Sequence, residues 1–183
     1  WVKVAKFLGP ERVRVGDALI GLASDGLHTN GYSLARRIVQ DRMHLGPDDP
    51  FPDESGGAST ADVLLRVHRS YLAALRPVLG VVHAMAHITG GGLPGNVNRA
   101  LPSNLDAVID AGSWTVPNVF MQLQKAGNVA MDEMYRAFNM GVGMVVISAA
   151  HRVETIVGAA QSVGVRAWRL GRIESGAGQV IIS

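Results

Sequence analysis

The chain has 183 residues, a length that fits one domain or at most two small ones and can bury a sizeable core without a disulfide or metal. It contains no cysteine, which excludes disulfides, thiolate metal sites, iron–sulfur clusters and a cysteine nucleophile. The 17 basic and 15 acidic residues leave a formal charge of +2, too small and too scattered to indicate a nucleic-acid or anionic-membrane partner.

The N-terminus begins with Trp1, without a methionine, directly on the strand-like run Val-Lys-Val-Ala-Lys at 2–6. It carries no signal-peptide pattern, and the longest apolar runs are too short to span a bilayer. We expect the chain to be a piece of a longer protein.

An apolar run at 17–23 has turn residues on both sides, which predicts a buried strand. A polar, glycine-rich loop at 24–31 follows, and a helix is expected to begin at Tyr32 or Ser33. The segment 45–60 carries three prolines, a glycine pair and four acids without a base, which predicts a loop or a mobile flap.

A helix is predicted from a Ser or Thr cap at 59–60 to about Leu75, because apolar residues recur there at helical spacing. A strand at 81–89 leads into a glycine-rich turn at 90–95 and a short helix over 95–100. The remaining predicted elements are a strand at 105–109, a helix at 118–125 closed by Gly127, a strand at 143–148, a helix at 153–163, and a hairpin of 167–173 and 180–182.

Strands and helices are interleaved irregularly along the chain, and several connections are too short for parallel crossovers. The sequence therefore predicts an α/β fold of the α+β type, with a mixed, largely antiparallel sheet and packed helices.

The glycine-rich turn matches G-x-G-x-x-G through Gly90, Gly92 and Gly95. A dinucleotide site is disfavoured because the next strand begins only about ten residues later, and because Pro94 removes a backbone N–H. Two interpretations stay open: backbone amides that bind an anion at a helix N-terminus, or a tight turn that needs positive φ angles.

The loop after the first strand centres on His28, which can carry a proton or bind phosphate because the ordinary pKa of histidine lies near neutrality. Asn30 offers a donor and an acceptor, and Gly26 and Gly31 allow close backbone approach. The alternative is an ordinary strand-to-helix connection in which Asn30 or Ser33 caps the helix.

His83 and His87 are predicted on one face of a strand, as core histidines or as supports for other groups, and no metal site is predicted. His44, His68 and His151 stand in charged surroundings and are predicted to be solvated. The absence of a Ser/His/Asp spacing, nucleophile elbow or paired-carboxylate motif argues against a self-contained hydrolase.

Three segments and the terminal Gly-Arg-Ile at 171–173 carry a resemblance to a known family. The segments are His28-Thr29-Asn30-Gly31-Tyr32-Ser33-Leu34, Ile88-Thr89-Gly90-Gly91-Gly92-Leu93-Pro94-Gly95-Asn96 and Glu133-Met134-Tyr135-Arg136-Ala137-Phe138-Asn139-Met140-Gly141-Val142-Gly143-Met144. The chain resembles phosphoribosylformylglycinamidine cyclo-ligase, the aminoimidazole ribonucleotide (AIR) synthetase family of purine biosynthesis. The resemblance covers essentially all of 1–183 but corresponds only to the C-terminal domain of that family.

This resemblance implies an enzyme, a ligase that converts formylglycinamidine ribonucleotide (FGAM) to AIR while ATP becomes ADP and phosphate. It implies that phosphorylation of the formyl oxygen precedes attack of the amidine nitrogen. The family binds ATP and Mg²⁺ mainly through an N-terminal domain that this chain lacks. The resemblance also implies a homodimer in the cytoplasm, with the small molecule FGAM as substrate and with neither nucleic acid nor membrane as partner.

Site residues are carried over from the matching motifs. The loop with His28 and Asn30 is expected at the reacting end of the substrate, with catalytic roles for both residues. Substrate binding is expected at Gly31, Gly90, Gly91, Gly92 and Asn139, with Gly91 and its two neighbours at the ribose phosphate and Asn139 and Gly141 behind the loop. The chain departs from the family at 67–71, where Val-His-Arg-Ser-Tyr replaces Pro-Thr-Arg-Ile-Tyr, and no ligand contact is assigned there.

FGAM synthetase is the second enzyme that the resemblance allows, and selenophosphate synthetase, thiamine-phosphate kinase and a hydrogenase maturation protein belong to the same superfamily. A different class is a non-catalytic sugar-phosphate-binding module, which describes the isolated fragment. We expect the isolated chain to lack ATPase activity and to expose an apolar face where the missing domain docks.

Overall fold

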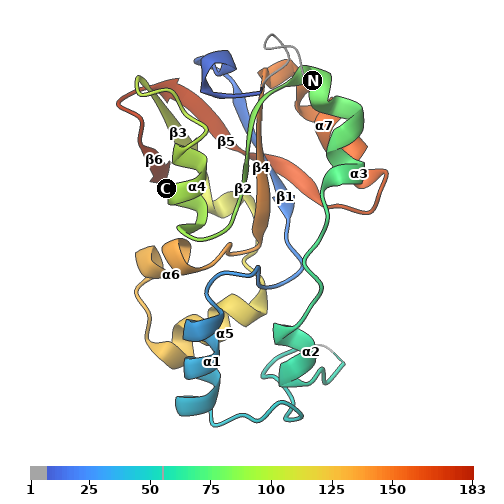
Figure 1. Cartoon of the computed structure of the whole chain (residues 1–183), viewed down its shortest axis with the longest axis vertical. Coiled ribbons are helices and arrows are strands. Elements are labelled where there is room, and N and C mark those ends of the chain that lie inside the picture. Colours follow the sequence, from blue (N-terminus) through green and yellow to red (C-terminus); the bar gives the residue numbers. More distant parts are fainter. Residues whose placement is uncertain (1–7, 55) are drawn as a thin grey trace, which may run out of the picture.

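The computed structural model describes residues 8–54 and 56–183, and the strand expected at 2–6 lies outside them. Within the described residues, six strands form one sheet in the order β2-β4-β1-β5-β3-β6 (Figure 1). All neighbours pair antiparallel except β3 and β6, which are parallel. This confirms the predicted fold class. The strands are β1 (Ala18–Ala23), β2 (Val82–His87), β3 (Leu105–Ile109), β4 (Val142–Ser148), β5 (Ala167–Ser175) and β6 (Val180–Ile182).

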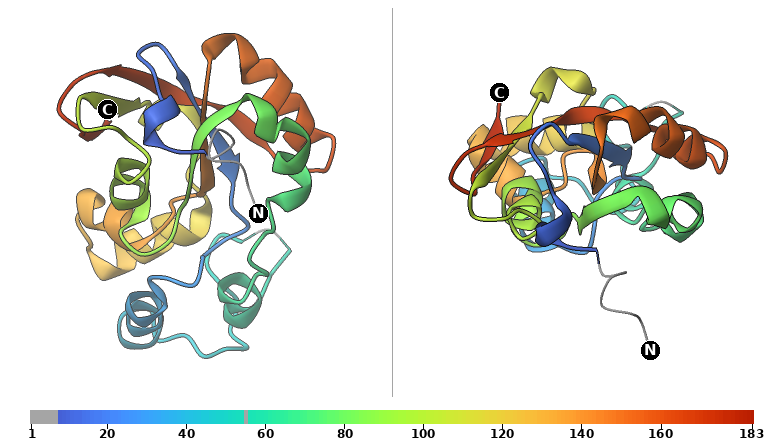
Figure 2. Two further views of the ribbon diagram at one scale, coloured as in Figure 1. Left: turned by 45° about the horizontal axis from the view of Figure 1, so that its top comes forward. Right: turned by 90° about the horizontal axis from the view of Figure 1, so that it is seen from above.

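Helices cover both faces of the sheet and form a separate group beyond one end of its strands (Figure 1). α4 packs on one face, and α3 and α7 lie side by side on the other (Figure 2). α1, α2, α5 and α6 make up the separate group. The helices are α1 (Tyr32–Asp41), α2 (Thr60–Leu64), α3 (Leu72–Leu75), α4 (Gly92–Asn98), α5 (Asn118–Gly127), α6 (Met131–Ala137) and α7 (Val153–Gln161).

Three buried apolar clusters follow this arrangement. Leu19 joins the cluster under α4, whereas its neighbours Ala18 and Ile20 join the cluster under α3 and α7, as the alternation of side chains along a strand requires. The third cluster, which includes Phe120 and Phe138, fills the space among the separate group of helices. The sheet thus has a core on each face, and the third core lies among the separate helices.

The prediction of one continuous helix from 59–60 to Leu75 is wrong, because the structure has two short helices with a non-helical segment between them. The Ser59 cap is confirmed, because Asp62 N–H donates to Ser59 Oγ at 3.1 Å, but α2 ends at Leu64 and α3 begins only at Leu72. α2 packs in the third cluster and α3 packs against the sheet, so the chain between them must cross from one core to another. Val67, which the helical spacing placed inside, is 82% exposed.

The hairpin predicted for the last two strands is also wrong. β3 lies between β5 and β6 and pairs with both. Asp106 on β3 explains this, because its Oδ1 accepts the backbone N–H groups of Ala177 at 2.8 Å and Gln179 at 2.7 Å. These bonds hold the connection between β5 and β6 against β3, so that β6 pairs with the side of β3 opposite to β5.

The other predicted elements are present with boundaries shifted by a few residues, except that α6 was not predicted as a helix and α4 begins at Gly92 instead of 95. The loop at 45–60 is confirmed as irregular, but it is anchored: Phe51 is buried, and Glu54 pairs with Arg66 at 2.9 Å. Within the described ranges, none of the helices combines the length and apolarity that a bilayer crossing demands.

Candidate functional site

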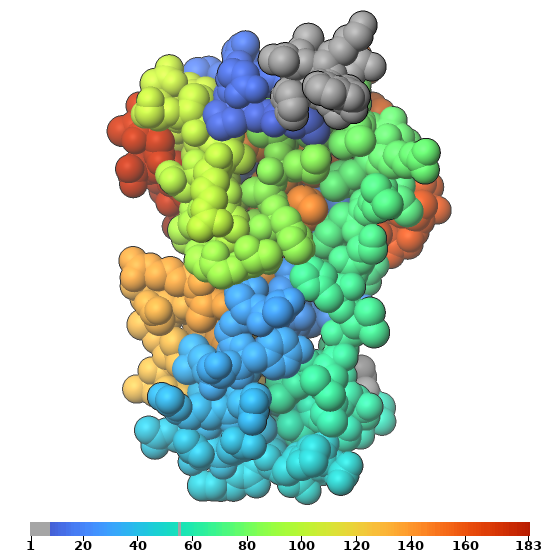
Figure 3. Space-filling view, viewed as in Figure 1, coloured from blue at the N-terminus to red at the C-terminus, as the bar shows by residue number. Residues whose placement is uncertain are grey.

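Three segments that are distant in sequence meet at one end of the strands β2, β4 and β1. β1 and β2 both run antiparallel to β4, which lies between them, so their C-terminal ends lie beside the N-terminal end of β4. The loop 24–31 after β1, the glycine turn 88–92 after β2 and the segment 139–141 before β4 therefore come together. Figure 3 shows the blue loop after β1 directly below the yellow-green glycine turn, where the molecule narrows.

His28 joins the first two of these segments. Its ring Nδ1 lies 2.8 Å from the carbonyl oxygen of Ile88, and the N–H must be on Nδ1 because a carbonyl only accepts. Nε2 then carries a lone pair, and this atom is buried without a hydrogen-bond partner. A buried acceptor without a partner is costly, so it indicates a place where a ligand donor fits.

The charge state of His28 differs from the one expected for an isolated histidine. Burial lowers its pKa from 6.5 to about 4, and the nearby His68 and His87 lower it further, while the bond to Ile88 opposes the change. At neutral pH the ring is uncharged, so His28 can accept a proton but supplies no positive charge to a phosphate.

Asn30 follows His28 in the same loop, and one of its two side-chain amide atoms has a hydrogen-bond partner. Nδ2 donates to the carbonyl of Ala137 at 2.7 Å, whereas Oδ1 is buried without a partner. Neither Asn30 nor Ser33 caps α1, because the N-cap is Gly31 with φ 82° and no side-chain bond. A Cβ at Gly31 would lie 2.6 Å from Phe138 Cε1, so this glycine permits close packing against the third segment.

The glycine turn needs its glycines for conformation and for space. Gly91 and Gly92 have φ angles of 93° and 59°, which confirms the interpretation as a turn with positive φ. Gly90 and Gly91 are exposed, and among the described residues no backbone carbonyl accepts their N–H groups. Gly92 is buried, and a Cβ there would lie 1.7 Å from the carbonyl oxygen of Tyr135. Anion binding by this turn stays a prediction.

Asn96, which the sequence analysis missed, holds the glycine turn in shape. Its Nδ2 lies within hydrogen-bond distance of the carbonyls of Gly92 at 2.8 Å, and of Thr89 and Gly90 at 3.2 Å each. Thr89 Oγ1 donates to its Oδ1 at 3.1 Å. The signal was available in the sequence, since an Asn one turn into a short helix is placed to bond the preceding loop.

Asn139 holds the third segment against the first. Its Oδ1 accepts from Ser24 Oγ and from Gly141 N–H, each at 2.8 Å, and its Nδ2 donates to the carbonyl of Gly26 at 3.0 Å. Asn139 is 1% exposed, and both ends of its amide are engaged inside the protein. These contacts fit its expected place behind the loop, and they describe a positioning residue.

His68 and His87 lie beside His28, which the sequence analysis did not foresee. The ring of His68 stacks on that of His28 with centroids 3.8 Å apart, and His68 Nε2 lies 3.0 Å from His87 Nε2. Both residues are exposed. The predicted exposure of His68 is confirmed. Its contacts with His28 and His87 were not predicted, and they arise because the segment between α2 and α3 brings it to the site.

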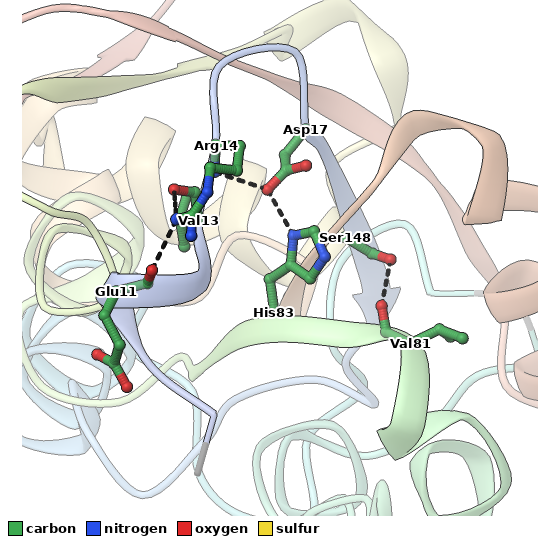
Figure 4. Close-up of polar contacts among 7 residues, drawn as sticks. All are labelled: Glu11, Val13, Arg14, Asp17, Val81, His83 and Ser148. Atoms are coloured by element: carbon green, nitrogen blue, oxygen red, sulfur yellow. Dashed lines mark hydrogen bonds and ion pairs between the residues drawn. The ribbon is translucent and has the colours of Figure 1, made fainter. Parts of the chain in front are cut away.

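His83 lies apart from this group, at the opposite end of β2. Its Nδ1 is 2.7 Å from Asp17 Oδ2, which also accepts the N–H of Arg14 at 2.9 Å (Figure 4). His83 is half-buried and His87 is exposed, so neither lies in the core. The core alternative for these two histidines is therefore wrong. The other alternative, a support for other groups, fits the contacts of His83 with Asp17 and of His87 with His68.

Residues 14–183 match the family described as AIR synthase related protein, C-terminal domain. The chain belongs to this family. A phosphoribosylformylglycinamidine cyclo-ligase of Trichlorobacter lovleyi is 46% identical over 165 residues, which are 89% of this chain and 47% of that protein. The chain thus spans about half the length of the curated relatives it matches.

Solved structures support the same family fold at lower sequence identity. Thiamine-monophosphate kinase from Stenotrophomonas maltophilia K279a superposes with a TM-score of 0.66 at 21% identity, over 100% of this chain and 54% of that one. The hydrogenase maturation protein HypE in complex with ATP gives 0.63 at 20% identity, over 99% of this chain and 51% of that one. These likenesses concern the fold of the family domain.

The lowered pKa of His28 predicts a pH-dependent stability. Between the unfolded value of 6.5 and the folded value of about 4, the unfolded chain binds more protons, so stability falls as the pH falls through this range. We expect the free energy of unfolding in urea to be about 2 kcal/mol lower at pH 5 than at pH 7.5 on account of His28 alone. His28→Gln should remove this part of the difference, whereas His151→Gln at an exposed histidine should retain it. Equal pH dependence in both variants would contradict the prediction.

Proposed function

We propose that this chain is the C-terminal half of an ATP-dependent cyclo-ligase that closes the imidazole ring of AIR from FGAM. The observation that carries the proposal is the 46% identity to a named cyclo-ligase over 89% of the chain. That match includes the three segments that meet at the edge of the sheet. FGAM synthetase, the second enzyme considered above, is not favoured by relatives of this kind.

The two unpartnered polar atoms support the proposed roles of the loop after β1. His28 Nε2 and Asn30 Oδ1 are both buried acceptors without a partner. His28 contacts the glycine turn through Ile88, and Asn30 contacts the carbonyl of Ala137. An amidine nitrogen that attacks a carbon must lose a proton, and the uncharged ring of His28 can accept it. Asn30 Oδ1 can accept a hydrogen bond from the same nitrogen centre and orient it.

The glycine turn is proposed to bind the ribose phosphate of the substrate. Gly90 and Gly91 are exposed, and in the described part of the chain no backbone carbonyl accepts their N–H groups. These N–H groups can therefore donate hydrogen bonds to phosphate oxygens. Gly31 and Asn139 are proposed to serve substrate binding through the shape of the loop, because Gly31 allows it to pack and Asn139 holds its backbone.

ATP and Mg²⁺ are proposed to bind mainly outside this chain. Mg²⁺ prefers carboxylate, phosphate and water oxygens. Within residues 8–54 and 56–183, the one group of three side chains close enough to share a metal consists of histidines, which do not fit Mg²⁺. A relative of the same fold has been solved with ATP, and we propose that the remaining half of the full-length protein supplies the equivalent site here.

The surface beside the site supports docking of such a second half. Leu72, Leu79 and Met85 are 69%, 38% and 38% exposed, and together with Tyr71 and Met144 they line a groove next to His87. An apolar groove of this kind favours a partner domain over open solvent. We also propose that the full-length protein is a homodimer that works in the cytoplasm, as the family resemblance implies.

The proposal is tested by measuring ADP formation by the full-length parent with and without FGAM. We expect turnover that requires FGAM, and no turnover by the isolated 183-residue chain. If ADP forms only with glutamine and the formylglycinamide precursor of FGAM, the protein is an FGAM synthetase. If the parent forms no FGAM-dependent ADP at all, the cyclo-ligase proposal is wrong.

A further inference from the structure

Three histidines from three separate elements meet beside the candidate site. His28 comes from the loop after β1, His68 from the segment between α2 and α3, and His87 from the end of β2. Their nearest ring nitrogens all lie within 4.8 Å of one another, and their ring centroids are 3.8, 5.0 and 5.3 Å apart. Three imidazoles at this spacing are the donor set that borderline transition metals prefer.

His28 is held in the state that a metal ligand needs. Its Nδ1–H donates to the backbone carbonyl of Ile88 at 2.8 Å, which fixes the ring and leaves the lone pair of Nε2 free. Metal-binding histidines almost always donate their second ring N–H to a carbonyl or carboxylate in this way. Nε2 is also buried without a partner, and the side chain is only 2% exposed.

His68 and His87 leave the group open to solvent on one side. Both side chains are exposed, and they line the groove that Tyr71 and Leu72 border. Arg69, which lines the same groove, pairs with Asp25 at 3.6 Å. A metal can therefore enter from the groove, and water can take a fourth position.

Ligation requires one local rearrangement. The rings of His28 and His68 now stack with an interplanar angle of 16°, whereas two nitrogens on a tetrahedral ion lie about 3.4 Å apart with their lone pairs converging. His68 is exposed and belongs to no helix or strand, so a change of its rotamer can bring its nitrogen into line.

We propose that His28, His68 and His87 form a binding site for one divalent transition-metal ion of the Zn²⁺, Ni²⁺ or Co²⁺ class. The fourth position is open to water or to an added ligand. His68 occupies a position where the family pattern has threonine, so the complete donor set belongs to this chain and not to that pattern. A bound ion would occupy the same Nε2 lone pair of His28 that the proposed proton transfer uses, so metal binding and turnover of FGAM exclude each other at this atom. Metal binding itself is tested without turnover.

The test is a titration of the purified protein with Zn²⁺ by calorimetry, and with Co²⁺ by visible absorption, which reports the geometry and nitrogen ligands of the ion. We expect one ion per chain and the intense absorption of a four-coordinate Co²⁺ site. His68→Thr should weaken Zn²⁺ binding by at least about tenfold and abolish that absorption. The matched control His151→Thr, at an exposed histidine outside the group, should change neither.

Because His68 is exposed, its replacement is not expected to disturb folding, and circular dichroism checks this. Binding that is equally strong in wild type and His68→Thr, or the absence of one-to-one binding in wild type, would overturn the proposal. A His28→Gln variant gives a second test, since it should also weaken binding by at least about tenfold, while its side-chain amide can still donate a hydrogen bond to a carbonyl.

Discussion

Gly92→Ala is expected to lower the free energy of unfolding by at least about 3 kcal/mol, the largest effect on stability that we predict for a single methyl group in this chain. The added Cβ would lie 1.7 Å from the carbonyl oxygen of Tyr135, and the residue has a φ of 59°, where alanine is strained. Because the obstacle is the backbone of α6 and not a flexible side chain, relief requires α4 and α6 to move apart. Urea unfolding followed by circular dichroism measures the loss.

Gly95→Ala is the matched control for this variant. It adds the same methyl group to the same helix, but no atom outside the adjacent backbone of α4 lies within 4 Å of the new Cβ. Alanine also favours a helix over glycine by about 1 kcal/mol, so this variant should be neutral or more stable. Equal destabilisation by the two substitutions would mean that the contact between α4 and α6 does not set the requirement for glycine.

His28→Ala in the full-length parent is expected to lower kcat by at least a hundredfold, or about 2.7 kcal/mol of barrier. The physical reason is the unpartnered Nε2, which is the one proton acceptor of this ring that the protein leaves free. Steady-state ADP formation with saturating FGAM measures the loss. His151→Ala, which removes an exposed histidine outside the site, should keep the activity of the wild type.

Two outcomes separate the role of His28 from the function itself. If the parent turns over FGAM and His28→Ala does so nearly as fast, the cyclo-ligase function holds and the assignment of His28 is wrong. A fold defect is recognised by the unfolding free energy of the variant at pH 7.5, where the wild-type ring is uncharged. Loss of this buried ring removes both its bond to Ile88 and its packing, including the stack with His68.

Local patterns were enough to predict most of the fold. The apolar run at 17–23 became β1, because a buried strand depends on a few adjacent residues. α5 ends at Gly127 as predicted, but the left-handed residue that caps it is Asn128, with a φ of 46°. The helix predicted to Leu75 failed for the opposite reason. Its apolar residues keep a helical period, yet α2 and α3 pack in different cores, and no local pattern records that separation.

Site residues that belong to a sequence motif could be predicted. Site residues that only the folded chain brings together could not. The motif at 28–34 led to His28 and Asn30, the two residues whose buried acceptor atoms lack partners. His68 was missed because its neighbours His28 and His87 are 40 and 19 positions away in sequence. Asn96 was missed because its side chain contacts three backbone carbonyls that only the folded turn brings together.

The order of the strands has a consequence for how the chain folds. In the sheet described here, no two strands that follow each other in sequence are hydrogen-bonded neighbours. No hairpin can therefore nucleate it, and every ladder closes a long loop, which predicts slow folding. During synthesis β1 must wait for β4, more than one hundred residues later, or on the order of ten seconds at ribosomal speed. For that time an almost wholly apolar strand stays unpaired, so chaperone binding to the nascent chain is expected to concentrate on it.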